Sequence, residues 1–113
     1  MSETRRPKVF VTHERANFSY AEALQFGDVE FLVSSTQEFM PMPTSGDGNE
    51  KIEDAVWTKL EDNYMPGYDY ILLSGSPIII FLVGQACPAP NGESHKVLRW
   101  NGRTRVYDTA IVG

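Results

Sequence analysis

Residues 68–83 read YDYILLSGSPIIIFLV, and this segment decides the fold. Its first half is typical of a buried strand, and a short Ser-Gly-Ser turn separates it from a second apolar run. Pro77 stands where a helix would begin, with Ser76 as its N-cap, because proline at the first helical position loses no hydrogen bond. The β-branched residues of the run also fit a strand. The Ser-Pro entry favours a buried helix over residues 78–86.

The turn formed by Ser74, Gly75 and Ser76 is the leading candidate for a ligand site. A strand that passes through glycine into a helix N-terminus presents free backbone N–H groups and the positive end of the helix dipole. Open α/β sheets also bind ligands at the carboxyl ends of their strands. The alternative is an ordinary turn and helix cap, since the pattern matches neither a P-loop nor a dinucleotide fingerprint. We expect the turn to hold phosphate or another anion.

Further elements lie on the amino-terminal side of this segment. Residues 8–13 and 28–34 are rich in β-branched and aromatic side chains and predict two strands. The residues between them, 16–26, fit a short helix or a packed loop. A stretch rich in proline and glycine, 37–49, predicts a long loop. A helix is expected from Asn49 until Pro66-Gly67 ends it.

The carboxyl-terminal part of the chain predicts a β-hairpin. Two strand-like runs flank Asn101-Gly102, and this dipeptide favours a two-residue type I′ turn because both residues tolerate a positive φ. In that register Trp100 faces Arg103, and Leu98 faces Arg105. A longer loop would shift these pairs.

The order of these elements is strand, strand, helix, strand, helix, hairpin. It predicts one compact α/β domain, residues 1–113, with a mixed sheet, two main helices and a C-terminal β-hairpin. The length of 113 residues matches the common size of a single domain. With 42% apolar and 22% charged residues, the composition is that of an ordinary globular chain and argues against disorder.

Charge is unevenly distributed along the chain, whose net charge is −5. Residues 14–69 are strongly acidic, whereas the charged residues of 94–105 are all basic. Proteins that bind duplex DNA or RNA are usually basic, because phosphate neutralisation supplies most of their affinity. Duplex nucleic acid is therefore not an expected partner. A small anion held by the carboxyl-terminal arginines remains compatible with the charge.

Those arginines surround an aromatic residue. Arg99, Trp100, Arg103 and Arg105 together suit a ligand with a base and phosphates, through stacking and bidentate hydrogen bonds. The alternative is a hairpin whose tryptophan covers the core. Its arginines would then pair with the acidic part of the chain, within one molecule or between subunits.

His13 and Arg15 follow the first strand. In a parallel arrangement they would lie near the Ser-Gly turn, where His13 would donate to a ligand and Arg15 would bind an anion. A polar cluster at a strand end is also common as a turn without a ligand.

Catalytic and metal chemistry have little support in the sequence. His13, His95 and Cys87 show no spacing typical of metal ligands. Ser74 lacks the Gly-x-Ser-x-Gly pattern of a nucleophile elbow. We expect no enzyme activity, no catalytic residue, no metal and no cofactor.

The expected setting is a reducing cytoplasm. Cys87 is the single cysteine and cannot form an internal disulfide. The longest apolar run is far shorter than the roughly 20 residues that a membrane span requires. The amino terminus lacks the apolar core of a signal peptide. Neither a membrane nor a secretory route is expected.

The chain resembles a family of small proteins carried by bacteriophages and prophages. The residues that carry the resemblance are 9–14, 69–77, 97–101, Arg105 and Tyr107. The sequence departs from the family pattern at Asn101-Gly102, where an acidic-basic pair is more usual. Its size and lack of catalytic groups are also similar to phage sponge proteins, which sequester nucleotide signals of bacterial immunity. That similarity implies a homo-oligomer with ligands at subunit interfaces.

The leading expectation is a non-catalytic phage-type binding protein that holds a small phosphate-bearing ligand, with a nucleotide as the favoured class. A second hypothesis is a protein-interaction or inhibitor module that acts on a host protein without a small ligand. It is motivated by Phe39, Met40 and Met42 in the long loop, since methionine and phenylalanine suit adaptable protein contacts. A third, a small nucleotide hydrolase, has no base–nucleophile pair to support it.

Overall fold

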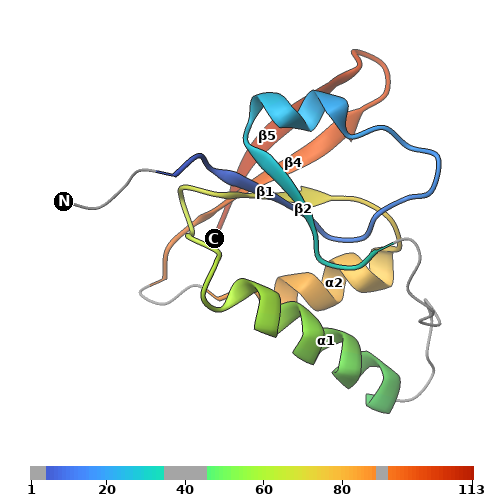
Figure 1. Ribbon diagram of the computed structural model, residues 1–113, viewed down its shortest axis with the longest axis vertical. Helices are drawn as coiled ribbons and strands as arrows, with labels where there is room; N and C mark the ends of the chain where they lie inside the picture. Colours follow the sequence, from blue (N-terminus) through green and yellow to red (C-terminus); the bar gives the residue numbers. More distant parts are fainter. Residues whose placement is uncertain (1–4, 35–45, 89–91) are drawn as a thin grey trace.

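The computed structural model describes residues 5–34, 46–88 and 92–113, which form one α/β unit (Figure 1). Its five-stranded sheet has the order β2-β1-β3-β4-β5. The strands are β1 (Lys8–Val11), β2 (Asp28–Phe31), β3 (Tyr70–Leu73), β4 (His95–Asn101) and β5 (Val106–Val112). The first four are parallel to one another, and β5 runs antiparallel to β4. The predicted mixed sheet with a terminal hairpin is confirmed.

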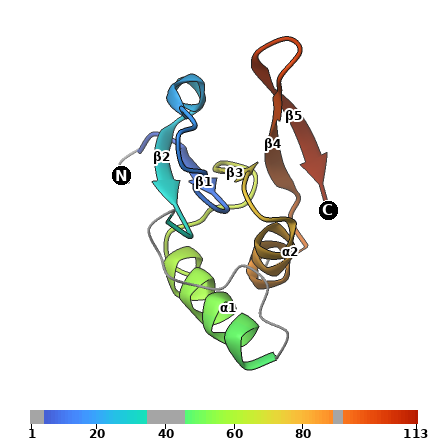
Figure 2. The same ribbon diagram turned by 90° about the vertical axis from the view of Figure 1, so that its right-hand side faces the viewer.

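Helical elements cover both faces of the sheet (Figure 2). The helices α1 (Gly46–Leu60) and α2 (Pro77–Ala86) lie side by side on one face, and the 3-10 helix η1 (Ala21–Gln25) lies on the other. Right-handed crossovers explain why the helical elements lie on opposite faces. The connection from β1 to β2 runs towards one edge of the sheet, whereas the connections to β3 and β4 run towards the other edge. The carboxyl ends of β1 and β3 therefore form a topological switch point, where open sheets bind ligands. None of the described helices has the length and apolar character needed to cross a membrane.

Two apolar cores follow from the alternation of side chains along the strands. Phe10 and Ile71 point towards α1 and α2, whereas Val9, Val11 and Leu72 point towards η1. The helices supply buried side chains to the first core: Ile52, Val56, Leu60, Ile79, Leu82 and Val83. Aromatic residues, Tyr20 and Tyr107 among them, fill much of the second core.

Residues 77–86 form the predicted helix, but its cap differs from the expected one. Ser76 occupies the N-cap position with an extended backbone, and Pro77 begins the helix. The Ser76 side chain makes no capping hydrogen bond. The start of α2 is therefore set by the fixed φ of Pro77 rather than by a side-chain capping hydrogen bond.

The boundaries of α1 also differ from the prediction. It begins at Gly46 rather than Asn49, and it ends at Leu60, ahead of Pro66. The Asn63 side chain donates to the Lys59 carbonyl at 2.9 Å and satisfies one of the last helical acceptors. Most of the predicted long loop, with Phe39, Met40 and Met42, lies outside the described residues.

The hairpin has the longer loop that the sequence left open, so the register predicted for a two-residue turn is wrong. Asn101 pairs with Val106, so residues 102–105 form the loop, and Trp100 faces Tyr107 instead of Arg103. Leu98 likewise faces Thr109 rather than Arg105. The Asn101 side chain accepts hydrogen bonds from the backbone N–H groups that follow it, at 3.0 and 3.2 Å. This Asx-type turn closes a longer loop, in which Arg105 adopts the positive φ of 61°.

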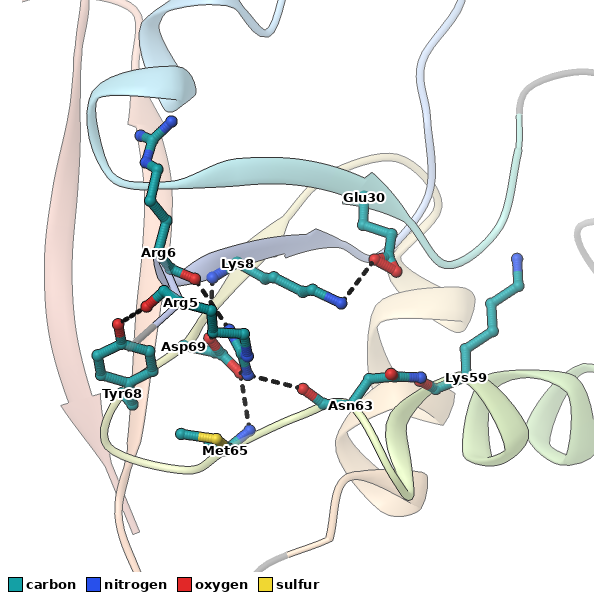
Figure 3. A network of polar contacts seen from close by, with 9 residues as sticks. All are labelled: Arg5, Arg6, Lys8, Glu30, Lys59, Asn63, Met65, Tyr68 and Asp69. Carbon is teal, nitrogen blue, oxygen red and sulfur yellow. Dashed lines mark hydrogen bonds and ion pairs between the residues drawn. The ribbon is translucent and has the colours of Figure 1, made fainter. Parts of the chain in front are cut away.

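A buried carboxylate fastens the amino-terminal segment to the turn before β3 (Figure 3). The Asp69 side chain has no solvent exposure and accepts two hydrogen bonds from the Arg5 guanidinium, at 2.8 and 2.7 Å. It also accepts from the backbone N–H groups of Lys8 and Met65, each at 2.8 Å. Tyr68 donates its hydroxyl proton to the Arg5 carbonyl. This network holds the amino ends of β1 and β3 together, at the end of the sheet opposite to the switch point.

Candidate functional site

A cavity of about 280 Å³ lies at the carboxyl ends of β3 and β4. It brings together predicted site residues from three separate segments, namely Arg15, Ser74, Gly75, Arg99 and Trp100. The parallel pairing of β1, β3 and β4 explains this convergence, because the carboxyl ends of parallel neighbours meet at one edge of the sheet. The cavity is therefore the candidate functional site.

Gly75 gives the turn its shape. Its φ of +84° lies in the left-handed region, which favours glycine. A Cβ atom at this position would lie 2.5 Å from both Cβ and Nδ1 of His13. The turn after β3 thus packs directly on the residue that follows β1, and His13 lies beside the Ser-Gly turn as the parallel arrangement predicts.

Most polar groups of Ser74 are already used inside the protein. Its N–H donates to Thr12 Oγ1 at 2.9 Å, and the Thr12 hydroxyl donates to the Ser74 carbonyl at 2.7 Å. The Ser74 and Tyr20 hydroxyls share a hydrogen bond of 2.7 Å, and the Arg15 N–H donates to Tyr20 at 2.8 Å. These bonds fix the cavity wall and occupy the N–H and the carbonyl of Ser74, and its hydroxyl pairs with that of Tyr20.

The other backbone N–H groups near the turn differ in whether they already donate to a partner within the protein. The Ser76 N–H donates to Nδ1 of His13 at 3.1 Å, so it is also occupied. The first helical bond of α2 runs from the Ile80 N–H to the Ser76 carbonyl at 3.0 Å. The N–H groups of Ile78 and Ile79 precede this ladder. Within the described residues, the Gly75 N–H also lacks a hydrogen-bond partner, and Gly75 lines the cavity.

Two arginines supply positive charge to the cavity. The Arg15 guanidinium packs over the Phe18 ring, 4.9 Å from its centroid. Arg99 forms an ion pair of 3.0 Å with Asp108, and its side chain is 71% exposed. An exposed pair of this kind costs little to rearrange towards a ligand. Arg103 and Arg105 lie in the exposed hairpin loop, and the structure does not place them in the cavity wall.

Aromatic rings form another wall of the cavity. Trp100 meets Phe18 edge-on, with ring centroids 5.8 Å apart, and meets Tyr107 at 4.9 Å. Tyr107 is buried, and its hydroxyl has no hydrogen-bond partner within the described residues. Burial, with Tyr20 and Glu22 nearby, raises the pKa of Tyr107 to about 12. The hydroxyl therefore keeps its proton at neutral pH.

Phe18 and Tyr107 are the aromatic cavity residues that the sequence prediction missed. Phe18 belongs to a stretch without clear periodicity. Its closeness to Arg15 in the sequence is a signal that could have indicated an aromatic–cation pair. Tyr107 was obscured by the wrong hairpin register, which did not place it opposite Trp100.

The pH dependence of stability provides a test of the contact between His13 and the turn. Burial lowers the pKa of His13 below its ordinary value of 6.5, although Glu14 opposes the effect. The unfolded chain therefore takes up this proton at a higher pH than the folded chain. The stabilisation is complete above about pH 6.5 and is lost as the pH falls through the lowered pKa.

We expect His13→Gln to remove this component of the pH dependence. Chemical denaturation of the wild type and the variant at several pH values between 7.5 and 5 would measure it. Identical pH profiles of the two proteins would show that the folded state does not perturb His13.

A second polar cluster lies elsewhere, beside the start of β4. The Tyr64 hydroxyl and His95 Nδ1 are 2.5 Å apart, and Cys87 Sγ lies 3.7 Å from the same nitrogen. Burial raises the pKa of the Cys87 thiol to about 11, which does not favour a nucleophilic thiolate. Among the described residues, no group of three or more His, Cys, Asp or Glu side chains is placed to hold a metal ion.

The fold and the cavity together define a small doubly wound α/β protein with an arginine-bearing, aromatic-walled cavity at the carboxyl ends of its central parallel strands. Comparison with protein families shows a match to Phage Pam3 gp32-like protein over residues 7–112. The chain therefore belongs to this phage protein family, which confirms the expected phage relationship. No curated protein and no solved structure matches the chain.

Proposed function

We propose that this protein binds a small phosphate-bearing ligand, with a nucleotide as the favoured class, in the cavity at the carboxyl ends of β3 and β4. The observation that supports the proposal is the convergence of Arg15, Gly75, Arg99 and Trp100 on one cavity from separate segments of the chain. Arginine guanidinium groups suit phosphate through charge-assisted bidentate hydrogen bonds. The exposed face of an aromatic ring suits a nucleobase.

The volume of the cavity limits the size of the ligand that it can hold. Its volume of about 280 Å³ is near the lower end for small-molecule sites, which favours a ligand of about mononucleotide size. In this arrangement Arg15 and Arg99 contact phosphate, and the Gly75 N–H donates to it. Trp100 and Phe18 contact the base. His13 acts by holding the Ser76 N–H and the turn, since its Nδ1 already accepts that hydrogen bond.

We also propose that binding occurs without catalysis. The Ser74 hydroxyl pairs with Tyr20 rather than with a base, and it is nearly buried. Activation of a serine nucleophile requires an adjacent general base. In a phage protein, non-catalytic binding would serve to sequester a host nucleotide signal, as a sponge does.

A thermal-shift screen tests this proposal. The panel includes mononucleotides, cyclic di- and trinucleotides, ADP-ribose derivatives and inorganic phosphate. A ligand at one hundred times its dissociation constant adds about 2.7 kcal/mol, which corresponds to on the order of 10 °C for a domain of this size. Inorganic phosphate alone distinguishes a simple anion site from one that also recognises the base. A panel without any shift would contradict the proposal and direct attention to a host protein as the partner.

Substitution of the cavity arginines separates the site from general charge attraction. We expect Arg15→Gln and Arg99→Gln each to weaken binding of the best ligand by about 10- to 100-fold, because a hydrogen bond to a charged group contributes about 1.5–3 kcal/mol. Calorimetric titration at fixed ionic strength would measure the effect. Arg103→Gln is the matched control, since it removes the same charge outside the cavity. An equal loss in all three variants would show non-specific attraction rather than a site.

A further inference from the structure

The two edge strands of the described sheet differ in their chemistry. β2 is short and carries Asp28 and Glu30, both of which form ion pairs. Short length and charged side chains protect an edge strand from pairing with another chain. β5 is longer, and its only charged residue is Asp108. β5 is therefore the edge that lacks this protection.

Apolar side chains of β5 are exposed on both faces of the sheet. Ile111 is 65% exposed and shares a face with Tyr107, whereas Val106 and Val112 lie on the face of α2. An apolar groove of about 500 Å³ between α2 and the hairpin includes Val112 in its wall. The loop end of the hairpin extends beyond the helical elements (Figure 2).

We propose that β5 pairs with β5 of a second copy of this chain, antiparallel across a two-fold axis at Thr109. A two-fold interface must be self-complementary, because the same patch serves both subunits. Pairing about Thr109 sets Val106 opposite Val112 of the partner subunit and Tyr107 opposite Ile111 of the partner subunit. Each pair joins two apolar side chains on one face, the combination that stabilises neighbouring strands.

The same register also matches opposite charges. Arg105 directly precedes β5 and Gly113 directly follows it, so in this register Arg105 lies at the same end of the pairing as Gly113 of the partner subunit. A Cβ atom on Gly113 would lie 3.1 Å from Ser94 Cα and 3.5 Å from the Glu93 carbonyl oxygen. Arg105 of each copy therefore lies at the same end of the pairing as the backbone of residues 93–94 of the partner subunit, where Glu93 supplies the opposite charge. Both residues are exposed, and neither forms an ion pair within the described residues. This complementarity favours a second copy over an unrelated strand.

Light scattering coupled to size-exclusion chromatography tests the association over a wide range of protein concentration. We expect the wild type to have the mass of a dimer and Ile111→Lys to have half that mass, since lysine on an edge strand opposes pairing. Trp57→Lys, an equally drastic change at an exposed position on α1, is the matched control and should remain dimeric. Circular dichroism confirms that each variant is folded. A monomeric wild type, or a dimer unaffected by Ile111→Lys, would overturn the proposal.

A cysteine variant tests the register. Thr109→Cys places identical residues opposite each other, with Cα atoms about 4.5–5.5 Å apart, within the range for a disulfide. Mild oxidation should therefore link two copies covalently. Thr104→Cys in the hairpin loop and the wild type, which retains Cys87, should not form this link. A dimer in which Thr109→Cys fails to cross-link would exclude this register. The experiments require no ligand, so their outcome is independent of the proposed binding function.

Discussion

Replacement of Asp69 by alanine is expected to lower the free energy of unfolding by about 3–5 kcal/mol, the range for removal of one partner from a buried ion pair. Asp69 accepts four hydrogen bonds, two from Arg5 and two from backbone N–H groups (Figure 3). The alanine variant leaves all four donors without their acceptor, and it releases the amino-terminal segment from the turn before β3. Urea denaturation followed by circular dichroism would measure the change.

Asp28→Ala is the matched control for this prediction. Asp28 also pairs with an arginine, Arg6, but both side chains are more than half exposed. An exposed ion pair contributes about 0–1 kcal/mol, so the control should change stability little. Comparable losses in the two variants would show that burial does not determine the contribution of Asp69.

The acid dependence of stability follows from the same contacts. Burial of Asp69 opposes its ionisation, but the hydrogen bonds from Arg5, Lys8 and Met65 outweigh it and lower its pKa below the ordinary value of 3.8. The unfolded chain binds this proton at a higher pH than the folded chain. The contribution is therefore present above about pH 3.8 and is lost as the pH falls through the lowered pKa. We expect the difference between wild type and Asp69→Ala to shrink in that range.

The segment around the Ser-Gly turn was predictable because its signals are local. Pro77 fixes the start of α2, and the apolar run before Ser74 is long enough only for a strand. Parallel pairing then brings His13 to the turn. The sequence could not reveal that Ser74 is occupied, because its partners Thr12 and Tyr20 are 62 and 54 residues away.

The hairpin shows a different limit of prediction. Asn101-Gly102 is a strong signal for a two-residue turn, but the Asn101 side chain instead organises residues 102–105. Competition between a backbone turn and an Asx turn depends on small energy differences that the dipeptide alone does not reveal. Because the loop is longer than predicted, Arg103 and Arg105 lie in it and do not line the cavity. Arg99 and Trp100, at the end of β4 beside β3, do line it.

Gly75→Ala is expected to destabilise the fold by about 2–6 kcal/mol. A residue other than glycine at a left-handed φ costs about 1–3 kcal/mol, and overpacking against His13 adds about 1–3 kcal/mol. Gly84→Ala is the matched control, because nothing lies within 4 Å of its Cβ position and alanine favours a helix. Gly84→Ala should leave stability unchanged or raise it slightly. Denaturant unfolding of both variants would compare them.

A double variant separates the two causes of the Gly75→Ala effect. His13→Gly removes the Cβ atom that the new methyl group would meet at 2.5 Å, but it does not change φ at position 75. Gly75→Ala should therefore cost less in the His13→Gly background, and the difference measures the steric contact. If the cost is the same in both backgrounds, the backbone conformation alone requires glycine.

The same variant also tests the turn as part of the ligand site. Under conditions where Gly75→Ala remains folded, displacement of His13 and Ser76 should weaken binding of the best ligand at least tenfold, a change of about 1.4 kcal/mol. Gly84→Ala, on α2 but outside this cavity, should bind like the wild type. Unchanged affinity in folded Gly75→Ala would remove the turn from the site and leave binding to the arginines and Trp100. A selective loss would show that the left-handed glycine supports ligand binding as well as the fold.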